Sequence, residues 1–159
     1  MKILSMTSLG LALLAAPAFA ESHMSGDPEA GENVFKRCKS CHMVVSDDGE
    51  EIQKGGKTGP NLYGIYQRQA GSVENFRYGD ALVAAGEQGL KWEEADFVAY
   101  VGDPKGFLAE HLDDKKARSK MAFKLKSEED AANVWAYLVS VGPEVEAGDA
   151  GEEAEEATN

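Results

Sequence analysis

The chain has 159 residues, which is enough for one ordinary domain and too few for two. Its formal net charge is −12 at pH 7, so we do not expect nucleic-acid binding, which needs a basic surface. It contains only two cysteines, which excludes a disulfide-rich scaffold.

The first 20 residues have the pattern of a secretory signal peptide. Lys2 precedes an apolar run over residues 3–16, and Ala18-Phe19-Ala20 matches an A-x-A cleavage site. Polar residues interrupt the run, which is also too short to span a bilayer well. We therefore expect cleavage after Ala20, export to the periplasm and no stable membrane insertion.

A first helix is predicted after a flexible N-terminal stretch, residues 21–26. Asp27 can cap the helix, and Pro28 is favoured at its first position. Val34 and Phe35 lie on the helix face that continues towards the two cysteines. We therefore expect one face of this helix to contact both the core and whatever the cysteines hold.

The sequence Cys38-Lys39-Ser40-Cys41-His42 is the C-x-x-C-H attachment signature of a c-type haem. Cysteines three residues apart lie on one helical turn, so both sulfurs can form thioethers with one porphyrin while His42 binds the iron. A thioredoxin-like dithiol would follow a strand, and none is predicted before Cys38. A zinc site would need four ligands, and the chain has only two cysteines and three histidines. The motif thus predicts one haem c, covalently attached through Cys38 and Cys41.

Long loops are predicted after this motif. Residues 44–62 contain many turn formers and few apolar side chains, and residues 63–78 continue without a helical pattern. Loops of this length need a surface to lie on, so we expect them to wrap around the cofactor. A short helix is predicted from about Asp80 to Gly86.

Two helices are predicted in the next segment. Residues 92–101 are amphipathic, and we place Trp92, Ala95 and Val98 on the inward face, together with Tyr100 or Val101. Asp103-Pro104 ends this helix and starts a shorter one.

The last predicted helix begins after Ser127, which can cap it, and ends before Gly142-Pro143. The strand-like alternation of polar and apolar residues is absent from the sequence. The predicted fold class is therefore all-α.

A haem held by His42 can take a second protein ligand on its opposite face. Met43 adjoins His42 and cannot easily reach that face, and Met24 lies in the flexible start. Met121 lies in a stretch without helix signals just before the last helix. Met121 is therefore the preferred candidate for the second iron ligand, on the face opposite His42. His111 ranks behind it.

Several motifs in order resemble the class I c-type cytochromes, in particular the larger periplasmic bacterial proteins that are similar to mitochondrial cytochrome c. These motifs are Gly31 and Phe35 before the C-x-x-C-H sequence, Thr58-Gly59-Pro60-Asn61-Leu62, Phe76-Arg77-Tyr78, Trp92 with Tyr100, Lys120-Met121-Ala122-Phe123 and Trp135-Ala136-Tyr137-Leu138. The resemblance implies a cytochrome c domain over residues 27–143. In that fold, short helices and long loops wrap around one covalently bound haem.

The resemblance also implies how polar groups meet the haem. The carbonyl of Pro60 would accept the second ring N–H of His42 and fix the orientation of the ring. Arg68, Tyr78 and Trp92 would donate hydrogen bonds to the haem propionates, whose burial is costly without donors.

Further implied roles concern the other face and the exposed edge of the haem. Tyr100 would lie near the Met121 sulfur, and Phe123 near the exposed edge. Residues 115–126 hold six basic residues and no acid, whereas residues 144–159, which we expect to form a disordered acidic tail, hold seven acids and no base. The expected docking residues are Lys39, Lys115, Lys116, Arg118, Lys120, Lys124 and Lys126.

By resemblance, the protein is a monomeric one-electron carrier and not an enzyme. His/Met ligation raises the haem potential and leaves no open coordination position. The implied donor is the membrane bc complex, and the implied acceptor is a terminal cytochrome c oxidase, a photosynthetic reaction centre or a denitrification reductase. The alternatives are a haem c protein with a labile sixth ligand, acting as a weak peroxidase or gas sensor, and a haem-free dithiol oxidoreductase.

Overall fold

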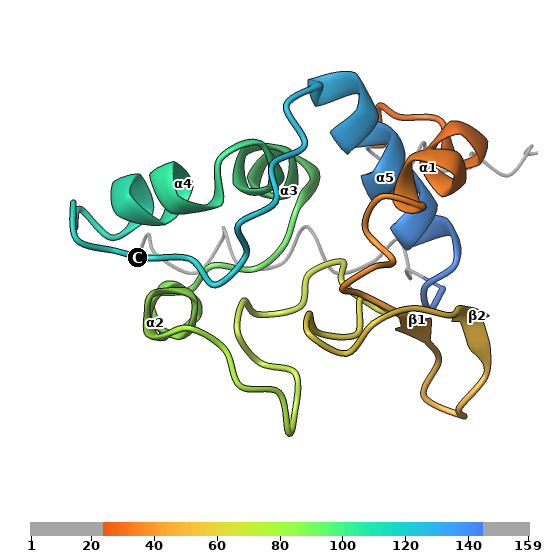
Figure 1. The fold of residues 1–159 in the computed structure, drawn as a ribbon, viewed down its shortest axis with the longest axis horizontal. Coiled ribbons are helices and arrows are strands. Elements are labelled where there is room, and N and C mark those ends of the chain that lie inside the picture. Colours follow the sequence, from red (N-terminus) through yellow and green to blue (C-terminus); the bar gives the residue numbers. More distant parts are fainter. Residues whose placement is uncertain (1–23, 145–159) are drawn as a thin grey trace, which may run out of the picture.

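The computed structural model describes residues 24–144 (Figure 1). The predicted signal peptide over residues 1–20, residues 21–23 and the acidic segment 145–159 lie outside the described residues. Within residues 24–144, no helix is both long and apolar enough to cross a membrane.

Short helices dominate the described part of the chain, as predicted. Their bounds are α1 Pro28–Phe35, α2 Asp80–Glu87, α3 Glu94–Gly102, α4 Pro104–His111 and α5 Glu128–Ser140. The strands β1 Val44–Val45 and β2 Glu51–Gln53 pair antiparallel as a small ribbon in the segment for which only loops were predicted. The ribbon is too short to alter the all-α class.

Three helices begin at caps that the sequence indicates. The side chain of Asp27 accepts a hydrogen bond from the Ala30 N–H at 3.0 Å, and Asp103 caps α4 in the same way at 3.1 Å. The Ser127 hydroxyl accepts a hydrogen bond from the N–H of Asp130 at 3.1 Å. These side chains satisfy N–H groups that have no partner inside their own helices.

The first and last helices pack closely against each other (Figure 1). A Cβ atom added at Gly31 would lie 1.9 Å from the carbonyl oxygen of Asn133, so this crossing requires glycine. Nearby, the rings of Phe35 and Tyr137 lie 5.6 Å apart. The sequence at Gly31 thus sets how closely α1 and α5 approach.

Residues 24–26, the described end of the predicted flexible stretch, contact two helices. The Ser25 N–H donates to a carboxylate oxygen of Glu94 on α3 at 3.0 Å, and the Ser25 hydroxyl bonds to the same carboxylate. A Cβ atom at Gly26 would lie 2.2 Å from the Ala132 carbonyl oxygen on α5. This segment therefore lies directly on α3 and α5.

The inward face of α3 differs in part from the predicted one. Trp92 is buried as predicted, but it precedes the helix, and Ala95 is exposed and Val98 only half-buried. Tyr100 and Val101, the two alternatives offered for the inward face, are both buried, and so is Phe97, which was not predicted. The placement of Ala95 was wrong because the pattern was counted from Trp92, whereas the helix begins at Glu94.

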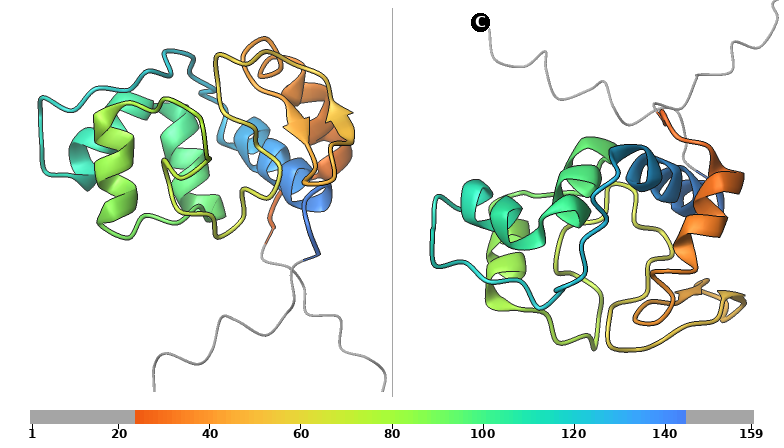
Figure 2. Two further views of the ribbon diagram at one scale, coloured as in Figure 1. Left: turned by 90° about the horizontal axis from the view of Figure 1, so that it is seen from below. Right: turned by 45° about the horizontal axis from the view of Figure 1, so that its top comes forward.

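The helices form two groups (Figure 2). Helices α2, α3 and α4 lie on one side of the molecule, while α1, α5 and the ribbon lie on the other. Helix α3 contacts α5 and joins the two groups. The loops between these elements pass through the space between the groups.

Candidate haem-binding site

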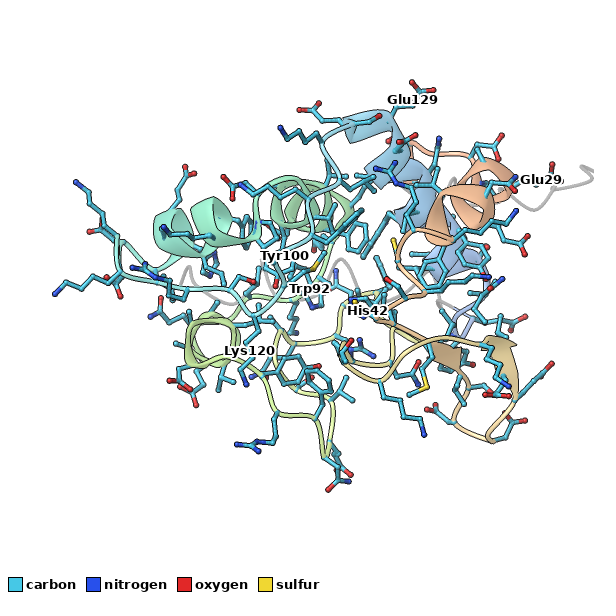
Figure 3. All side chains as sticks on the ribbon, viewed as in Figure 1. Glu29, His42, Trp92, Tyr100, Lys120 and Glu129 are labelled. Atoms are coloured by element: carbon cyan, nitrogen blue, oxygen red, sulfur yellow. The ribbon has the colours of Figure 1, made fainter. Side chains whose placement is uncertain are left out.

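A cavity of about 370 Å³ with a mostly apolar lining lies between the two helix groups. Figure 3 shows His42, Trp92 and Tyr100 gathered in the middle of the molecule, far from Glu29 and Glu129 at its periphery. The structure brings all ten predicted cofactor-binding residues to the lining of this cavity. They are Cys38, Cys41, His42, Pro60, Arg68, Tyr78, Trp92, Tyr100, Met121 and Phe123.

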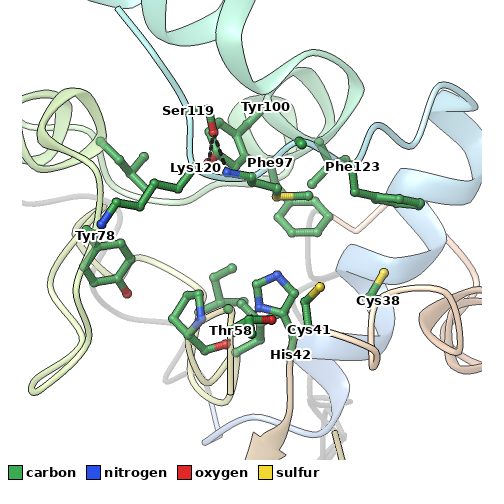
Figure 4. Close-up of a pocket in the computed structure, with 18 of the residues that line it drawn as sticks. Cys38, Cys41, His42, Thr58, Tyr78, Phe97, Tyr100, Ser119, Lys120 and Phe123 are labelled. Atoms are coloured by element: carbon green, nitrogen blue, oxygen red, sulfur yellow. Dashed lines mark hydrogen bonds between the residues drawn. The ribbon is translucent and has the colours of Figure 1, made fainter. Parts of the chain in front are cut away.

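The two cysteines lie beside each other along one side of the cavity. The N–H groups of Cys41 and His42 both donate to the carbonyl of Cys38 at 3.0 Å, so the motif forms a helical turn after α1. Figure 4 shows the two sulfurs next to the His42 ring. Burial raises the pKa of the Cys38 thiol to about 11. At the exposed Cys41, a hydrogen bond with Thr58 lowers the pKa of the thiol.

The His42 ring is held in one orientation. Its Nδ1 lies 2.9 Å from the Pro60 carbonyl oxygen, which as acceptor requires the proton on Nδ1 and leaves Nε2 with its lone pair. Burial lowers the pKa of His42, which favours the neutral imidazole that a metal needs. A Cβ atom at Gly59 would lie 2.4 Å from the ring, so the ring fits only against glycine.

The segment that carries Met121 lies across the cavity from His42. In Figure 4, Tyr100, Ser119 and Lys120 lie on the opposite side from the His42 ring. The Ser119 hydroxyl oxygen accepts from the Met121 N–H at 3.1 Å and lies 3.2 Å from the Tyr100 hydroxyl. Ser119 therefore fixes both the backbone of Met121 and the Tyr100 ring.

The other ligand candidates do not line this cavity. His111 is exposed at the end of α4 and stacks on Phe107, with 5.7 Å between ring centroids. Met24 packs against the core, and Met43 is half-buried beside His42. Of the four candidates for the second iron ligand, only Met121 lines the cavity.

The predicted hydrogen-bond donors come from two loops: Arg68 and Tyr78 lie between β2 and α2, and Trp92 lies between α2 and α3. Arg68 donates to the carbonyls of Tyr63 at 2.7 Å and Asn61 at 3.0 Å, and burial lowers the pKa of its guanidinium. Tyr78 and Trp92 line the cavity beside it. Arg68 thus holds the loop that carries Pro60 in addition to facing the cavity.

An exposed aromatic ring marks the mouth of the cavity. Phe123 is 39% exposed, and the guanidinium carbon of Arg37 lies 5.7 Å from its ring centroid. Arg37 also forms an ion pair with Asp130 at 3.2 Å. These contacts connect the end of α1 and the start of α5 to the mouth.

The predicted docking residues are spread unequally around this mouth. Arg118 and Lys120 line the cavity, and Lys120 Nζ donates to the carbonyl of Arg77 at 2.9 Å. Lys124 forms an ion pair with Asp103 at 2.8 Å, which offsets its charge. The remaining predicted residues are exposed outside the cavity lining; they are Lys39, Lys115, Lys116 and Lys126.

Sequence reasoning did not assign a role to some residues of the site. Thr58 bonds to Cys41, Gly59 faces the His42 ring, and Ser119 joins Tyr100 to Met121. Thr58 and Gly59 belong to the motif Thr58-Gly59-Pro60-Asn61-Leu62, so their position was available as a signal. Ser119 lies only two residues before Met121, but its partner Tyr100 is distant in the sequence.

The chain is similar in sequence and in structure to bacterial cytochromes. The sequence matches no family model. It is 61% identical over 133 residues to cytochrome c-551 of Roseobacter denitrificans, covering 84% of this chain and 91% of that protein. It is 52% identical over 143 residues to cytochrome c2 of Rhodobacter capsulatus, covering 89% and 98%. The solved structure of cytochrome c2 from Rhodobacter sphaeroides matches with a TM-score of 0.72 and 51% identity, covering 74% of this chain and 97% of that one.

Proposed function

This chain belongs to the class I c-type cytochromes, and we propose that it is a periplasmic one-electron carrier with His42 and Met121 as iron ligands. Its family membership confirms the predicted class I fold and the single haem c, covalently held through Cys38 and Cys41. Like its relatives, it is an electron-transfer protein and not an enzyme.

The observation that carries the ligand proposal is the placement of two side chains in one cavity. His42 keeps Nε2 available because Nδ1 bonds to Pro60, and the segment of Met121 lies on the other side. Bound haem iron supplies the chemistry by gaining and losing one electron. His42 and Met121 would both bind the iron, which favours electron transfer over binding of small molecules.

Several residues fix the positions of the two proposed iron ligands. Gly59 and Pro60 fix the orientation of the His42 ring, and Ser119 holds the backbone of Met121 through a hydrogen bond. Rigid ligands reduce the structural change between two oxidation states, and that is what a carrier requires. In this proposal, each of these residues acts by holding a ligand and does not itself exchange electrons.

We assign Arg68, Tyr78 and Trp92 to the haem propionates. All three bring donor groups to the cavity lining, and a buried carboxylate needs such donors. Arg68 has five N–H donors, so it can hold two loop carbonyls and still offer further donors.

Docking of redox partners is proposed at the mouth around Phe123. Phe123 is exposed beside Arg37, whose charge is offset by Asp130, and the cavity lining also includes Arg118 and Lys120. These last two side chains present positive charge on a chain whose net charge is negative. A local field of this sign orients an acidic partner before contact. The proposed donor is the membrane bc complex; a terminal oxidase, a photosynthetic reaction centre or a denitrification reductase is the proposed acceptor. Cleavage after Ala20 would release the protein as a monomer into the periplasm.

The replacement Met121→Ala tests the ligand proposal. We expect the variant to keep its covalent haem, to lose the weak far-red methionine–iron absorption band and to have a lower reduction potential, because a thioether stabilises ferrous iron. Met43→Ala is a matched control, since Met43 is half-buried outside the cavity lining, and His111→Ala tests the second candidate. A Met121→Ala protein with the parent's band and potential would refute the assignment.

A further inference from the structure

One asparagine connects the chain segment that follows His42 to the segment that follows Pro60. The Asn61 side chain pairs with both backbone groups of Val45: its Oδ1 accepts from the Val45 N–H at 3.0 Å, and its Nδ2 donates to the Val45 carbonyl at 2.6 Å. The same oxygen accepts from the Tyr63 N–H at 3.1 Å. The side-chain amide thus takes the place of a backbone group beside β1 and ties two segments together.

Backbone hydrogen bonds pair the same two segments on both sides of His42. The Gly59 N–H donates to the Cys41 carbonyl at 2.8 Å, and the Leu62 N–H donates to the Met43 carbonyl at 3.1 Å. Along the chain, one of these bonds precedes His42 and the other follows it. The hydrogen bond of the imidazole therefore lies within a short ladder, and the asparagine side chain closes one end of that ladder.

The backbone carbonyl of Asn61 is held as well. It accepts from the guanidinium of Arg68 at 3.0 Å, and Arg68 lines the cavity. Pro60 and Leu62, on either side of Asn61 in the sequence, also line the cavity, whereas Asn61 itself is not part of the lining. Any effect of Asn61 on a bound haem must therefore pass through its neighbours.

The planarity of the peptide bond carries this restraint to Pro60. The Pro60 carbonyl and the Cα atom of Asn61 belong to the same planar peptide group. Because Asn61 is held at its side chain and at its own carbonyl, this plane has little freedom to rotate. The Pro60 oxygen is thereby kept 2.9 Å from Nδ1 of His42.

We propose that Asn61 is a positioning residue, which sets the strength of the hydrogen bond between His42 and Pro60 and, through it, the reduction potential of the haem. This role rests on the proposed function, in which His42 binds the iron. A hydrogen bond donated by Nδ1 makes the imidazole a stronger electron donor to its metal. A stronger donor stabilises ferric iron more than ferrous iron, so weakening the bond to Pro60 should raise the potential.

The replacement Asn61→Ala tests this role, because it removes the pairing with Val45 and keeps the backbone carbonyl that Arg68 holds. In the reduced, haem-containing protein with isotope-labelled histidine, NMR measures how fast the Nδ1 proton of His42 exchanges with water. We expect exchange about two- to tenfold faster than in the parent, the factor that one hydrogen bond contributes to a local opening equilibrium. A redox titration of the same variant should give a higher reduction potential.

Asn133→Ala is the matched control. Asn133 is half-buried, as Asn61 is, and its side chain also accepts from a backbone N–H, that of Asp27 at 2.7 Å. It lies on α5 and outside the cavity lining. The control should lower the denaturant midpoint and leave the exchange rate and the reduction potential at the parent's values.

Asn61→Ser decides if Asn61→Ala does not fold with haem. A serine hydroxyl can still accept from the N–H two residues further on, but it is too short to pair with both backbone groups of Val45. We expect the same two changes in this variant, with smaller size.

Three results would overturn the proposal. They are the parent's exchange rate in the Asn61 variant that folds, faster exchange without a higher potential, and equal changes in Asn133→Ala, which would show an effect of stability alone. A different result would mark a failure of the ligand proposal: in the parent itself, the Nε2 signal of His42 would lack the shift of an iron-bound nitrogen. That result would refute both the ligand assignment and the role of Asn61.

Discussion

At the scale of single residues, the contact of Gly59 with His42 shows how closely the chain packs around the imidazole ring. The imidazole of His42 is fixed by one hydrogen bond to Pro60 and by direct contact with the backbone of Gly59. Because protein interiors are close-packed, a single added methyl group at this point must displace the ring or the loop. The ring that is proposed to bind iron thus depends on a residue with no side chain.

Gly59→Ala should therefore disturb the haem site. The new Cβ would lie 2.4 Å from His42, and overpacking of this kind costs about 1–3 kcal/mol. We expect a lower denaturant midpoint and a shifted reduction potential. Gly102→Ala is a matched control, because the nearest atom to its Cβ would be 4.0 Å away. Equal midpoints and potentials in the two variants would contradict this account.

At the same scale, the sequence revealed some site residues and left others hidden. Cys38, Cys41 and His42 were predicted because their spacing alone has a chemical meaning. Ser119 has no such local signal, since its role arises only when folding brings it 3.2 Å from Tyr100. Phe97 likewise needed the structure, because its ring meets Trp135 on a different helix.

At the scale of elements, helix starts were predictable and strand pairing was not. The capping side chains at Asp27, Asp103 and Ser127 act within three residues, so the sequence contains the whole interaction. The ribbon of β1 and β2 contains only two and three residues, too few to show an alternating pattern. It is closed by a turn in which the Ser46 N–H donates to the Glu50 carbonyl at 3.0 Å.

The start of α5 offers a direct test of this local control. Ser127→Ala removes the acceptor for the Asp130 N–H, and losing such a cap costs about 1 kcal/mol. We expect a lower thermal midpoint with an unchanged haem spectrum, because Ser127 does not line the cavity. Ser127→Asp should restore the midpoint, since aspartate also caps helices. A midpoint unaffected by Ser127→Ala would show that packing against α1 alone fixes where α5 begins.

At the scale of the whole molecule, one buried apolar cluster spans both helix groups, and several of its members line the cavity. Helices α1 and α5 pack on each other, and α2, α3 and α4 form a second group joined to them mainly through α3 (Figure 2). Loop residues such as Ile65, Ala70 and Leu125 belong to this cluster. Covalent haem would fill the cavity and contact both groups, so composition and helix patterns alone could not define how the two groups pack.

The distribution of charge over the whole molecule leads to the last prediction. The net charge of −12 alone would repel an acidic partner, and salt would then speed association. The cavity lining instead includes Arg118 and Lys120, neither of which forms an ion pair within the described residues. If this local field governs encounter, second-order electron transfer to an acidic membrane partner should slow as ionic strength rises, because salt screens the attraction.

Charge reversal distinguishes the local field from the net charge. Lys120→Glu should lower the rate at low ionic strength and make its salt dependence weaker, whereas Lys91→Glu makes the same change in net charge at an exposed site outside the cavity lining. Electrostatic steering contributes about 10- to 1,000-fold to such rates, so a change of several-fold in Lys120→Glu is expected by stopped-flow measurement. Lys120 also donates to the Arg77 carbonyl, so the uncharged Lys120→Gln shows how much of the effect comes from losing that bond. Equal rates for Lys120→Glu and Lys91→Glu, or a rate that rises with salt in the parent, would show that net charge controls docking and that the mouth does not.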